Sequence, residues 1–542
     1  ARPGLIRQRL QSAGWTQAIA GRRIQRFAGS SLVYESTGAQ RPRAGREDVQ
    51  LALDIHASEE GSLQERIFDR IEALILSGKL RAGDPVPSSR ALSEDLDISR
   101  NTVILAYERL HAEGYLETRR GIGTFVCSNL PTINPALLRS AASRADTTAA
   151  GRQAIPGPAR VQRVTAPAVG PIDADFWIGR SDHGNFPLTE WRRVVGARLL
   201  AAGMAISEYP DPRGLPELRQ ALADHIGPAR GVLAGPDEVL VTGGVQDGLT
   251  QVALALRARS QSLLHEDPCY QGARYLFEAM GYACAGVPVD GEGLMVEALP
   301  QTGGHVLYVT PSHQFPLGVQ LSLPRRLALL DWAERTDSYI IEDDYNGDFR
   351  YEGAPLTALR GLDRHGRVIY LGTFSKAFGP GLRLGYLVMP PSMSAALPAW
   401  KALTSNGTTW LEQAAVADFI ASGSYQRHLR RLRSTCLRRR NLTIAALQSA
   451  FGAGIQLRGR RGGAHLSMVL PEGGIDPAEL VRRARAARVG IYSLEGCGAH
   501  AEAPTPCARR SLFFGYAAVP DARIGPALAK VAAVARTMEA GR

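Results

Sequence analysis

Cysteine is scarce in this sequence: six occur among 542 residues, and no two form a Cys-x-x-Cys pair. This usage excludes a scaffold held by disulfides and favours a reducing compartment. Apolar runs are short as well, and none is long enough to cross a bilayer. The first residues, ARPGLIRQRLQSAGW, carry arginines but lack the apolar core of a secretory signal. We therefore expect a cytoplasmic protein with no membrane partner.

The charge balance and the length set further bounds. The chain has 63 basic and 52 acidic residues, which gives a formal charge of +11. Such an excess permits a polyanionic partner but does not demonstrate one. With 45% hydrophobic and 21% charged residues, the composition is that of an ordinary globular protein. A chain of this length exceeds one compact core, so several domains are expected.

Changes in composition along the chain predict four segments. Residues 1–60 are polar, rich in arginine and weakly patterned, which predicts a flexible extension with no clear role. Residues 61–127 carry short helical patterns followed by two strands. Residues 128–171 are rich in alanine, arginine, threonine and proline, a composition typical of linkers. In residues 172–542, apolar strand patterns alternate with helical patterns, and we expect this segment to form the largest domain.

The stretch between residues 86 and 126 is typical of a helix-turn-helix. Ser88 or Ser89 can cap a first short helix, and Ser99 is placed to cap a second one. The second helix has one apolar stripe at positions i, i+3, i+4 and i+7, formed by Val103, Ala106, Tyr107 and Leu110. The exposed start of that helix, where a recognition helix meets DNA, carries Arg100, Asn101 and Thr102.

A hairpin with the sequence YLETRRGIGTFV follows, with Gly121 and Gly123 at its tip and Arg119 and Arg120 beside them. A hairpin so placed is a wing that can press basic side chains onto the phosphate backbone. Residues 61–127 contain nine basic and ten acidic residues, so net charge does not mark this module. Short amphipathic helices with a hairpin also occur in proteins that never touch DNA.

This module resembles the winged helix of the GntR family. The matching motifs are Ser89-Arg90, Ser99-Arg100, Thr102-Val103, Ala106-Tyr107, Glu113-Gly114-Tyr115-Leu116 and Gly123-Thr124-Phe125-Val126. Ser93 and Ile98 depart from the family pattern, which has alanine and valine at those positions. The resemblance implies contacts with DNA at Arg90, Ser99, Arg100, Arg120 and Gly121.

In the longest segment, six apolar stretches predict strands: EVLVTGG, SLLHEDP, HVLYVTP, SYIIEDDY, RVIYLGTFSK and LGYLVMP. Helical patterns such as DGLTQVALALRAR lie between them. This alternation predicts an α/β fold, with a mainly parallel sheet covered by helices on both faces. The chemistry of such a sheet gathers where its strands end.

Lys376 stands at one of these strand ends, between Ser375 and apolar residues. Charge is costly to keep there, so desolvation should lower the pKa of the lysine and free its amine to attack an aldehyde. Pyridoxal 5′-phosphate is the common cofactor that uses such a lysine. A surface lysine at a strand end is the simpler alternative, and Lys376 alone does not exclude it.

Other strand ends supply what this cofactor needs. The three acids in YIIEDDY offer a partner for the protonated ring nitrogen, and Tyr270 in EDPCYQG offers an aromatic face. Tyr345 can hydrogen-bond the ring hydroxyl. The turn and helix start in TGGVQDGLTQ form an anion site for the phosphate, to which Thr373, Ser375 and Arg383 can add donors.

Two further clusters carry weaker signals. Cys497, His500 and Cys507 resemble part of a metal site, but a fourth ligand at sensible spacing is missing, so no metal is predicted. Residues 425–461 hold ten arginines and no acid. We interpret this arginine-rich segment as a solvated helix face. A dimer or DNA contact that adds salt-sensitive affinity is the alternative.

The segment from residue 172 onward resembles the fold-type I aminotransferases, most specifically in YPDPRGLPELRQALADHI and in the SK…PGLRLG block. The resemblance implies a covalent bond between the cofactor and Lys376, and a small C-terminal α/β subdomain over roughly residues 415–542. Asp343 would pair with the ring nitrogen, with Asp344 as the alternative. The other implied cofactor-binding residues are Tyr345 at the ring oxygen, Tyr270 on the ring, Gly244, Val245, Gln246, Thr373, Ser375 and Arg383 around the phosphate, and His313.

Two departures weigh against ordinary transamination. Aminotransferases carry Asn-Pro-x-Gly where this chain has SHQFPLG, which places Phe315 at the asparagine position after His313 and Gln314. The arginine that holds a substrate carboxylate is replaced by Phe513 in SLFFGYA, although Arg509 and Arg510 precede it.

A winged helix, a linker and an aminotransferase-like domain, in this order, resemble the MocR subfamily of bacterial regulators, as do TPSHQFPLG and EDDYNGDFRY. The resemblance implies a head-to-tail, domain-swapped homodimer that binds promoter DNA at paired half-sites, with RNA polymerase as a further candidate partner. An amine or amino acid would form an external aldimine with the cofactor and free Lys376. Candidate effectors are γ-aminobutyrate, taurine, D-alanyl compounds and pyridoxal phosphate itself. Two alternatives stay open, a working aminotransferase with an accessory DNA-binding module and a vitamin B6 sensor.

Overall fold

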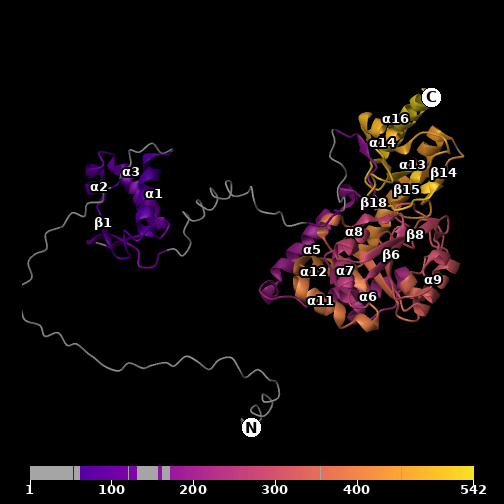
Figure 1. Cartoon of the computed structure of the whole chain (residues 1–542), viewed down its shortest axis with the longest axis horizontal. Helices are drawn as coiled ribbons and strands as arrows, with labels where there is room; N and C mark the ends of the chain where they lie inside the picture. Colours follow the sequence, from indigo (N-terminus) through magenta and orange to yellow (C-terminus); the bar gives the residue numbers. More distant parts are fainter. Residues whose placement is uncertain are drawn as a thin grey trace, which may run out of the picture. The chain divides into compact units, whose positions relative to one another are not determined.

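The computed structural model describes residues 53, 61–119, 121–130, 157–161, 171–353, 356–452 and 454–541. The chain separates into two compact units between residues 155 and 156 (Figure 1). Most of the expected N-terminal extension, most of the expected linker and Arg120 lie outside the described residues. Among the described helices, none combines the length and the apolar character that a membrane span requires.

The described part of the first unit contains three helices and a small antiparallel sheet. Its helices are α1 (Leu63–Leu76), α2 (Ser89–Asp95) and α3 (Arg100–Ala112), and its strands β1 (Pro85–Val86), β2 (Leu116–Arg119) and β3 (Gly123–Val126) lie in the order β1-β3-β2. The predicted apolar stripe is confirmed, because Val103, Ala106 and Leu110 are fully buried against α1 residues such as Phe68. The second helix of the helix-turn-helix and the wing are therefore present as predicted.

The helix caps of this unit agree with the sequence at one position and differ at another. The Ser88 hydroxyl accepts a hydrogen bond from the Ala91 amide at 3.1 Å, so Ser88 is the N-cap of α2. Ser99 occupies the N-cap position of α3, but its hydroxyl makes no capping hydrogen bond. Because Ser99 is exposed, water can satisfy the first amides of α3, and the expected cap bond there is wrong.

The second unit is built on an eight-stranded sheet. In spatial order its strands are β5 (Val239–Thr242), β13 (Gly385–Val388), β12 (Val368–Thr373), β11 (Tyr339–Asp343), β10 (Val306–Val309), β6 (Ser262–Asp267), β8 (Ala283–Asp290) and β9 (Gly293–Leu294). The neighbours from β12 to β8 are parallel, whereas β13 is antiparallel to both of its neighbours. The mainly parallel sheet is confirmed, and LGYLVMP is its reversed strand.

Helices cover both faces of this sheet because alternate strand residues point to opposite sides. Tyr308, Ile341 and Ile369 pack with α7 (Val245–Leu256), α8 (Gln271–Ala279) and α11 (Ala396–Ser405). Leu307 and Ile340 pack with α9 (Leu323–Arg335) and α10 (Leu359–Leu362). At the β5 edge, α5 (Leu188–Leu200), α6 (Pro216–Arg230) and α12 (Trp410–Ala421) complete the second layer.

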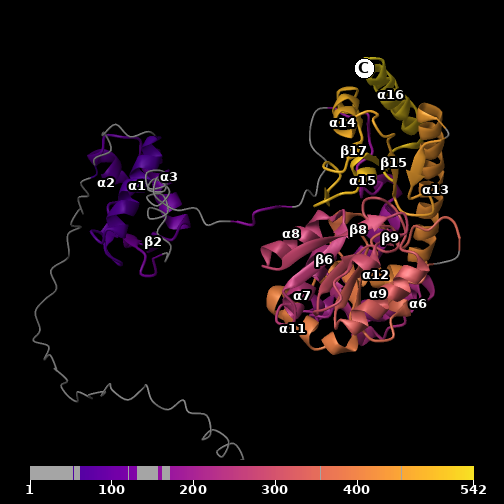
Figure 2. The ribbon, with the colours of Figure 1, turned by 45° about the vertical axis from the view of Figure 1, so that its right-hand side comes forward.

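A smaller layered region lies at one end of the second unit (Figure 2). Its four-stranded sheet has the order β14 (Gln456–Arg458), β15 (His465–Val469), β19 (Ser511–Gly515) and β17 (Tyr492–Ser493). It packs against α14 (Pro477–Ala486), α16 (Asp521–Ala540) and the long α13 (Ser424–Phe451). The strand β4 (Ala174–Asp175) pairs in parallel with β16 (Val489–Gly490). A segment near the start of the second unit in sequence therefore packs within the C-terminal region.

Candidate functional site

Lys376 follows β12, and its side chain is held by the start of the second unit. The Lys376 Nζ atom donates a hydrogen bond to the carbonyl oxygen of Gly179 at 3.0 Å. Burial of the amine lowers the pKa of Lys376 to about 8, and the charge of Asp343 opposes that shift. A lysine with a pKa near 8 has a substantial neutral fraction at physiological pH, so its amine can act as a nucleophile.

The two aspartates at the end of β11 have different surroundings. Asp344 is bound on both oxygens by Arg230, at 2.5 and 3.0 Å, and it also accepts a hydrogen bond from Tyr370. Asp343 accepts a hydrogen bond on Oδ2 from the Tyr308 hydroxyl at 2.6 Å, whereas Oδ1 has no partner among the described residues. Burial raises the pKa of Asp343 to about 6. The carboxylate with a free acceptor is thus Asp343, which favours it over Asp344 as the ring partner.

The predicted phosphate-binding residues converge at the first turn of α7. Gly244, the N-cap of α7, has a φ of 103°, and a Cβ there would lie 3.2 Å from Nη2 of Arg383. The first amides of a helix, here those of Val245 and Gln246, lack intrahelical acceptors and carry partial positive charge. A guanidinium beside this helix end is unfavourable unless an anion lies between them. The side chain of Gln246 points elsewhere and donates to the Gly272 carbonyl.

Two hydroxyl groups lie close to the lysine in sequence and in space. The Thr373 hydroxyl donates to the Ser375 oxygen at 2.9 Å, and the Ser375 amide donates back to Thr373 at 3.1 Å. This pair of bonds fixes the orientation of both hydroxyls on the turn that carries Lys376. The Thr373 proton is thus already used, whereas the proton of the Ser375 hydroxyl has no acceptor in this pair of bonds.

Aromatic side chains form the remaining wall of the site. Tyr270 belongs to β7 (Cys269–Tyr270), its ring meets that of Phe315 edge to face, and burial raises its pKa to about 12. The Tyr345 hydroxyl donates to the carbonyl oxygen of His313 at 2.9 Å. His313 is buried against His465, and burial holds its pKa well below the usual range. The structure brings these predicted residues together around Asp343 and Lys376.

The two departures from the aminotransferase pattern have different structural consequences. Phe315 lies beside Tyr270 and Tyr345, so an apolar ring occupies this wall of the site. Phe513 is fully buried, in the same core cluster as Trp177 and Tyr492. That position therefore offers no charge to a substrate carboxylate.

The arginine-rich segment is mostly the helix α13, and it is not a uniformly solvated face. Arg439 is buried and binds Asp182 and Asp521. Arg440 is buried and binds Glu352 at 2.7 Å. These two arginines tie α13 to neighbouring segments, which corrects the sequence-based interpretation for that part of the helix. The exposed arginines of α13 are Arg427, Arg430, Arg431 and Arg438.

The cysteine motif near the C-terminus does not assemble as a metal site. Cys497 donates to the Leu494 carbonyl, and the Cys507 sulfur accepts from Arg458. His500 instead lies near His265 and Glu502, two residues that the sequence did not connect with it.

In the first unit, the predicted DNA contacts lie on the surface of α2, α3 and the wing. Arg100 and Asn101 are exposed at the start of α3, Thr102 is half-buried, and Arg90 is exposed beside Glu94. Gly121 forms the wing tip with a φ of 74°, a conformation that favours glycine. Arg119 lies over the ring of Phe125 on the wing and binds Glu117.

Three residues of the site were missed by sequence reasoning. The Gly179 carbonyl accepts a hydrogen bond from Lys376, the Tyr308 hydroxyl donates one to Asp343, and Arg230 binds the carboxylate of Asp344. Each lies far from its partner in the chain, and none sits in a motif. Only the folded structure could identify them.

Comparison with known families agrees with this geometry. Residues 63–126 match the bacterial regulatory proteins of the gntR family, and residues 178–509 match the aminotransferases of class I and II. The second match covers more than half of the chain. A crystal structure of an α-aminoadipate aminotransferase from Thermus thermophilus is also similar, with a TM-score of 0.60 and 27% identity. The likeness covers 68% of this chain and 93% of that one.

Several curated regulators are similar over most of their length. YdeL of Bacillus subtilis, an HTH-type regulator, is 32% identical over 87% of this chain and 96% of its own. MocR of Rhizobium meliloti, a probable rhizopine catabolism regulator, is 34% identical over 71% of this chain and 76% of its own. PdxR of Corynebacterium glutamicum, a pyridoxine biosynthesis regulator, is 32% identical over 81% of this chain and 89% of its own. The chain therefore belongs to the MocR-type transcriptional regulators, in which a GntR-family DNA-binding domain is joined to a class I/II aminotransferase domain.

Proposed function

We propose that this regulator binds pyridoxal 5′-phosphate covalently through Lys376 and uses it to sense an amine or amino acid. The observation that carries the proposal is the buried, unpartnered Oδ1 of Asp343 in the same site as a lysine whose pKa is lowered to about 8. A buried polar atom without a partner is costly, and a protonated pyridine nitrogen is the kind of donor that would relieve the cost. The similar Thermus aminotransferase was solved with N-(5′-phosphopyridoxyl)-L-leucine, which supports the same cofactor class here.

The start of α7 supports the phosphate end of this assignment. A dianionic phosphate between the Gly244 turn and Arg383 would accept amide hydrogen bonds and separate the guanidinium from the positive helix end. Ser375 would add a hydroxyl donor, and Thr373 would add a second one if its proton turned from Ser375 to the phosphate. The carboxylate of Asp343 would therefore match the protonated ring nitrogen, and Arg383 with the start of α7 would match the negative phosphate.

The bound cofactor would supply an aldehyde that an effector amine can take over from Lys376. Once displaced, the Lys376 amine would be free to donate the hydrogen bond to the Gly179 carbonyl that it makes in the cofactor-free chain. Gly179 lies four residues after β4, in the segment that follows the expected linker in the sequence. A change in the Lys376–Gly179 bond thus acts on the part of the second unit that is joined in sequence to the DNA-binding unit. An effector biases DNA affinity if it binds two such states differently.

We assign operator recognition to α3 and to the wing. The exposed Arg100 and Asn101 at the start of α3 are placed to reach base edges and phosphates. Ser99, Thr102, Arg90 and the backbone at Gly121 would contact the phosphate backbone. Arg120, the other predicted wing contact, stays a sequence-based prediction.

We further propose that the second unit pairs with a second copy of this chain. Large apolar side chains gather at the end of α5, in the following turn Gly203–Ile206 and just beyond it. These side chains are Leu199, Leu200, Met204, Ile206 and Tyr209, and Leu200 is 93% exposed. An apolar surface of this kind on a regulator suits a self-complementary homodimer, which would also place two DNA-binding units on paired half-sites. The head-to-tail, domain-swapped arrangement remains the form that we propose for it.

The proposal is tested by DNA binding of the full chain in three states: cofactor-free, cofactor-loaded and cofactor-loaded with an amine. We expect candidate amines to change both the visible absorbance of the loaded protein and its affinity for promoter DNA, and Lys376→Ala to abolish both responses. Lys530→Ala, a change at a lysine of the same unit that is half-exposed, is the matched control. If no amine in a broad panel alters DNA affinity although the cofactor is bound, amine sensing is wrong.

The same experiment distinguishes amine sensing from the alternative of a vitamin B6 sensor. The similarity to a pyridoxine biosynthesis regulator supports that alternative. For that alternative, the cofactor-free and loaded proteins differ in DNA affinity and amines add nothing. A working aminotransferase would instead turn over an amino acid and a keto acid steadily, without any effect of amine on DNA binding.

A further inference from the structure

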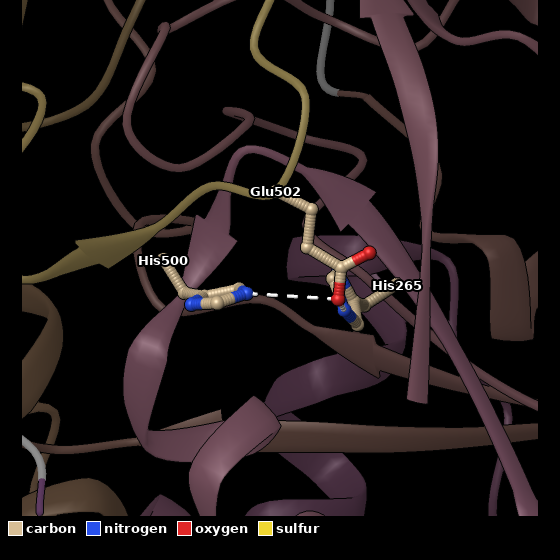
Figure 3. Close-up of side chains that lie close together, drawn as sticks. All are labelled: His265, His500 and Glu502. Atoms are coloured by element: carbon tan, nitrogen blue, oxygen red, sulfur yellow. Dashed lines mark ion pairs between the residues drawn. The ribbon is translucent and has the colours of Figure 1, made fainter. Parts of the chain in front are cut away.

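A second cluster of potential ligand side chains involves none of the residues assigned to the cofactor, although one of its strands pairs with the strand of Tyr270. His265 lies on β6, and His500 ends the strand β18 (Ala499–His500), which pairs antiparallel with β7. Glu502 follows two residues later. Figure 3 shows both imidazoles turned toward the Glu502 carboxylate.

The geometry of these three side chains is that of ligands around a common point. The Nε2 atoms of His265 and His500 each lie 3.7 Å from Oε1 of Glu502. All three potential ligand atoms lie within 4.8 Å of one another. Ligand atoms at about 2.0–2.1 Å from a tetrahedral zinc ion are roughly 3.3 Å apart, so small rotations of these side chains would complete the arrangement.

Both imidazole nitrogens that face the carboxylate are unsatisfied. His265 is 0% and His500 is 9% exposed, and neither Nε2 atom has a hydrogen-bond partner among the described residues. Buried polar atoms of this kind require an explanation, because nearly all others in folded proteins are paired. A bound ion would satisfy both at once.

The surroundings favour neutral imidazoles with a fixed tautomer. His265 Nδ1 lies 2.8 Å from the Glu266 carbonyl, so it carries the proton and leaves the Nε2 lone pair directed at the cluster. Burial lowers the pKa of both His265 and His500, which keeps the rings neutral. The Glu502 carboxylate is anchored through Oε2 by the Gly286 amide at 3.1 Å, which leaves Oε1 facing the two rings.

We propose that His265, His500 and Glu502 bind a divalent transition-metal ion of the zinc class. Two imidazoles and one carboxylate are a ligand set that suits such an ion, with a fourth position for water. Access to that position comes from a cavity of about 560 Å³, whose lining includes Tyr275, Ser493, His500, Glu502 and Arg509.

Arg274 is the internal competitor for this site. Its Nη2 atom lies 3.3 Å from Glu502 Oε1, and its Nη1 atom lies 3.0 Å from Glu278. When an ion binds Glu502, the guanidinium can keep its pair with Glu278. Arg274 therefore makes metal affinity moderate rather than preventing it.

The site would join two segments that flank the proposed cofactor. His500 pairs in register with Cys269, and Ala499 pairs with Tyr270, the residue assigned to the cofactor ring. A metal ion bound by His500 of β18 and by His265 of β6 would link the two strands and so restrict the position of Tyr270. This consequence rests on the proposed function, whereas the metal site itself does not.

The test is a titration of the full chain, free of any purification tag, with zinc and with cobalt(II) as a spectroscopic probe. We expect one equivalent per chain, and a loss of affinity of about 100-fold or more in His500→Ala and in Glu502→Gln. His365→Ala is the matched control, since His365 lies 3.8 Å from Glu334 in a surface pair without a second histidine. Arg274→Met should tighten binding by roughly two- to fivefold, because it removes the competing cation.

Thermal unfolding of each variant without metal keeps the result interpretable. If His500→Ala fails to fold, Glu502→Gln carries the test, because the Glu502 side chain is 35% exposed. A cobalt spectrum dominated by thiolate charge transfer, equal affinity in the variants and in His365→Ala, or no stoichiometric binding by the native chain would each overturn the proposal.

Discussion

The substitution Asp343→Asn is expected to remove the loss of folding stability that ionisation of Asp343 causes in the cofactor-free protein. Burial raises the pKa of Asp343 from 3.8 to about 6. The folded state therefore binds this proton more tightly than the unfolded state does. The stability that this provides is fully present below pH 3.8 and is lost as the pH rises through 6. A difference of roughly two pKa units corresponds to roughly 3 kcal/mol.

The assay is urea unfolding of the cofactor-free chain between pH 4 and 8, followed by tryptophan fluorescence. Five of the six tryptophans lie in the second unit, so the signal reports its unfolding. Relative to the native chain, Asp343→Asn should gain roughly 2.5 kcal/mol of stability between pH 4 and pH 7.5, because part of the full shift lies below pH 4. The asparagine amide adds an offset that does not depend on pH, so only the slope of the difference matters.

Asp290→Asn is the control for this prediction. Its hydrogen bond with Arg325 lowers the pKa of Asp290 below 3.8, so this carboxylate is ionised in both the folded and the unfolded chain over most of the range from pH 4 to 8. The stability difference between this variant and the native chain should therefore stay nearly constant with pH, whereas that of Asp343→Asn rises. A difference for Asp343→Asn that stays flat across the pH range would refute the claim that this carboxylate is ionised at a cost in the absence of the cofactor.

Three further predictions concern the cofactor, the DNA and the dimer. Arg383→Ala should weaken cofactor binding by about 10- to 100-fold in an absorbance titration, because it removes charge-assisted hydrogen bonds to the phosphate; unchanged affinity would contradict the Gly244–Arg383 cradle. Arg100→Ala should weaken promoter binding and reduce the slope of log affinity against log salt by about one, measured by fluorescence anisotropy; an unchanged slope would exclude a phosphate contact. Leu200→Asp should shift the chain toward monomer in sedimentation experiments, whereas an unchanged mass would place the dimer interface elsewhere.

The sequence predicted the elements that depend on local pattern. Continuous apolar runs such as VIYLG mark buried strands, because both faces of a central strand are covered. The stripe Val103, Ala106 and Leu110 likewise follows from helical periodicity alone. Strand direction cannot be predicted from such patterns, because LGYLVMP has the same apolar pattern as the parallel strands but runs antiparallel to its neighbours.

The choice between Asp343 and Asp344 shows where sequence reasoning ends. Both residues follow the same strand, and no local signal separates them. Arg230, which lies 114 residues earlier, decides the matter by binding Asp344 and leaving Asp343 with a free oxygen. The same holds for His500, whose neighbour His265 is brought to it only by the pairing of β18 with β7. Contacts of this kind arise from tertiary folding and leave no trace in spacing.

The most direct test of the central claim is borohydride reduction of the cofactor-loaded chain followed by peptide mapping. The sequence contains only three other lysines, Lys79, Lys401 and Lys530, so the modified residue can be assigned without ambiguity. We predict one phosphopyridoxyl group per chain, on the peptide that contains Lys376, and its loss when an effector amine is present before reduction. A chain that carries no adduct at Lys376, or that carries it equally on the other lysines, would contradict the account.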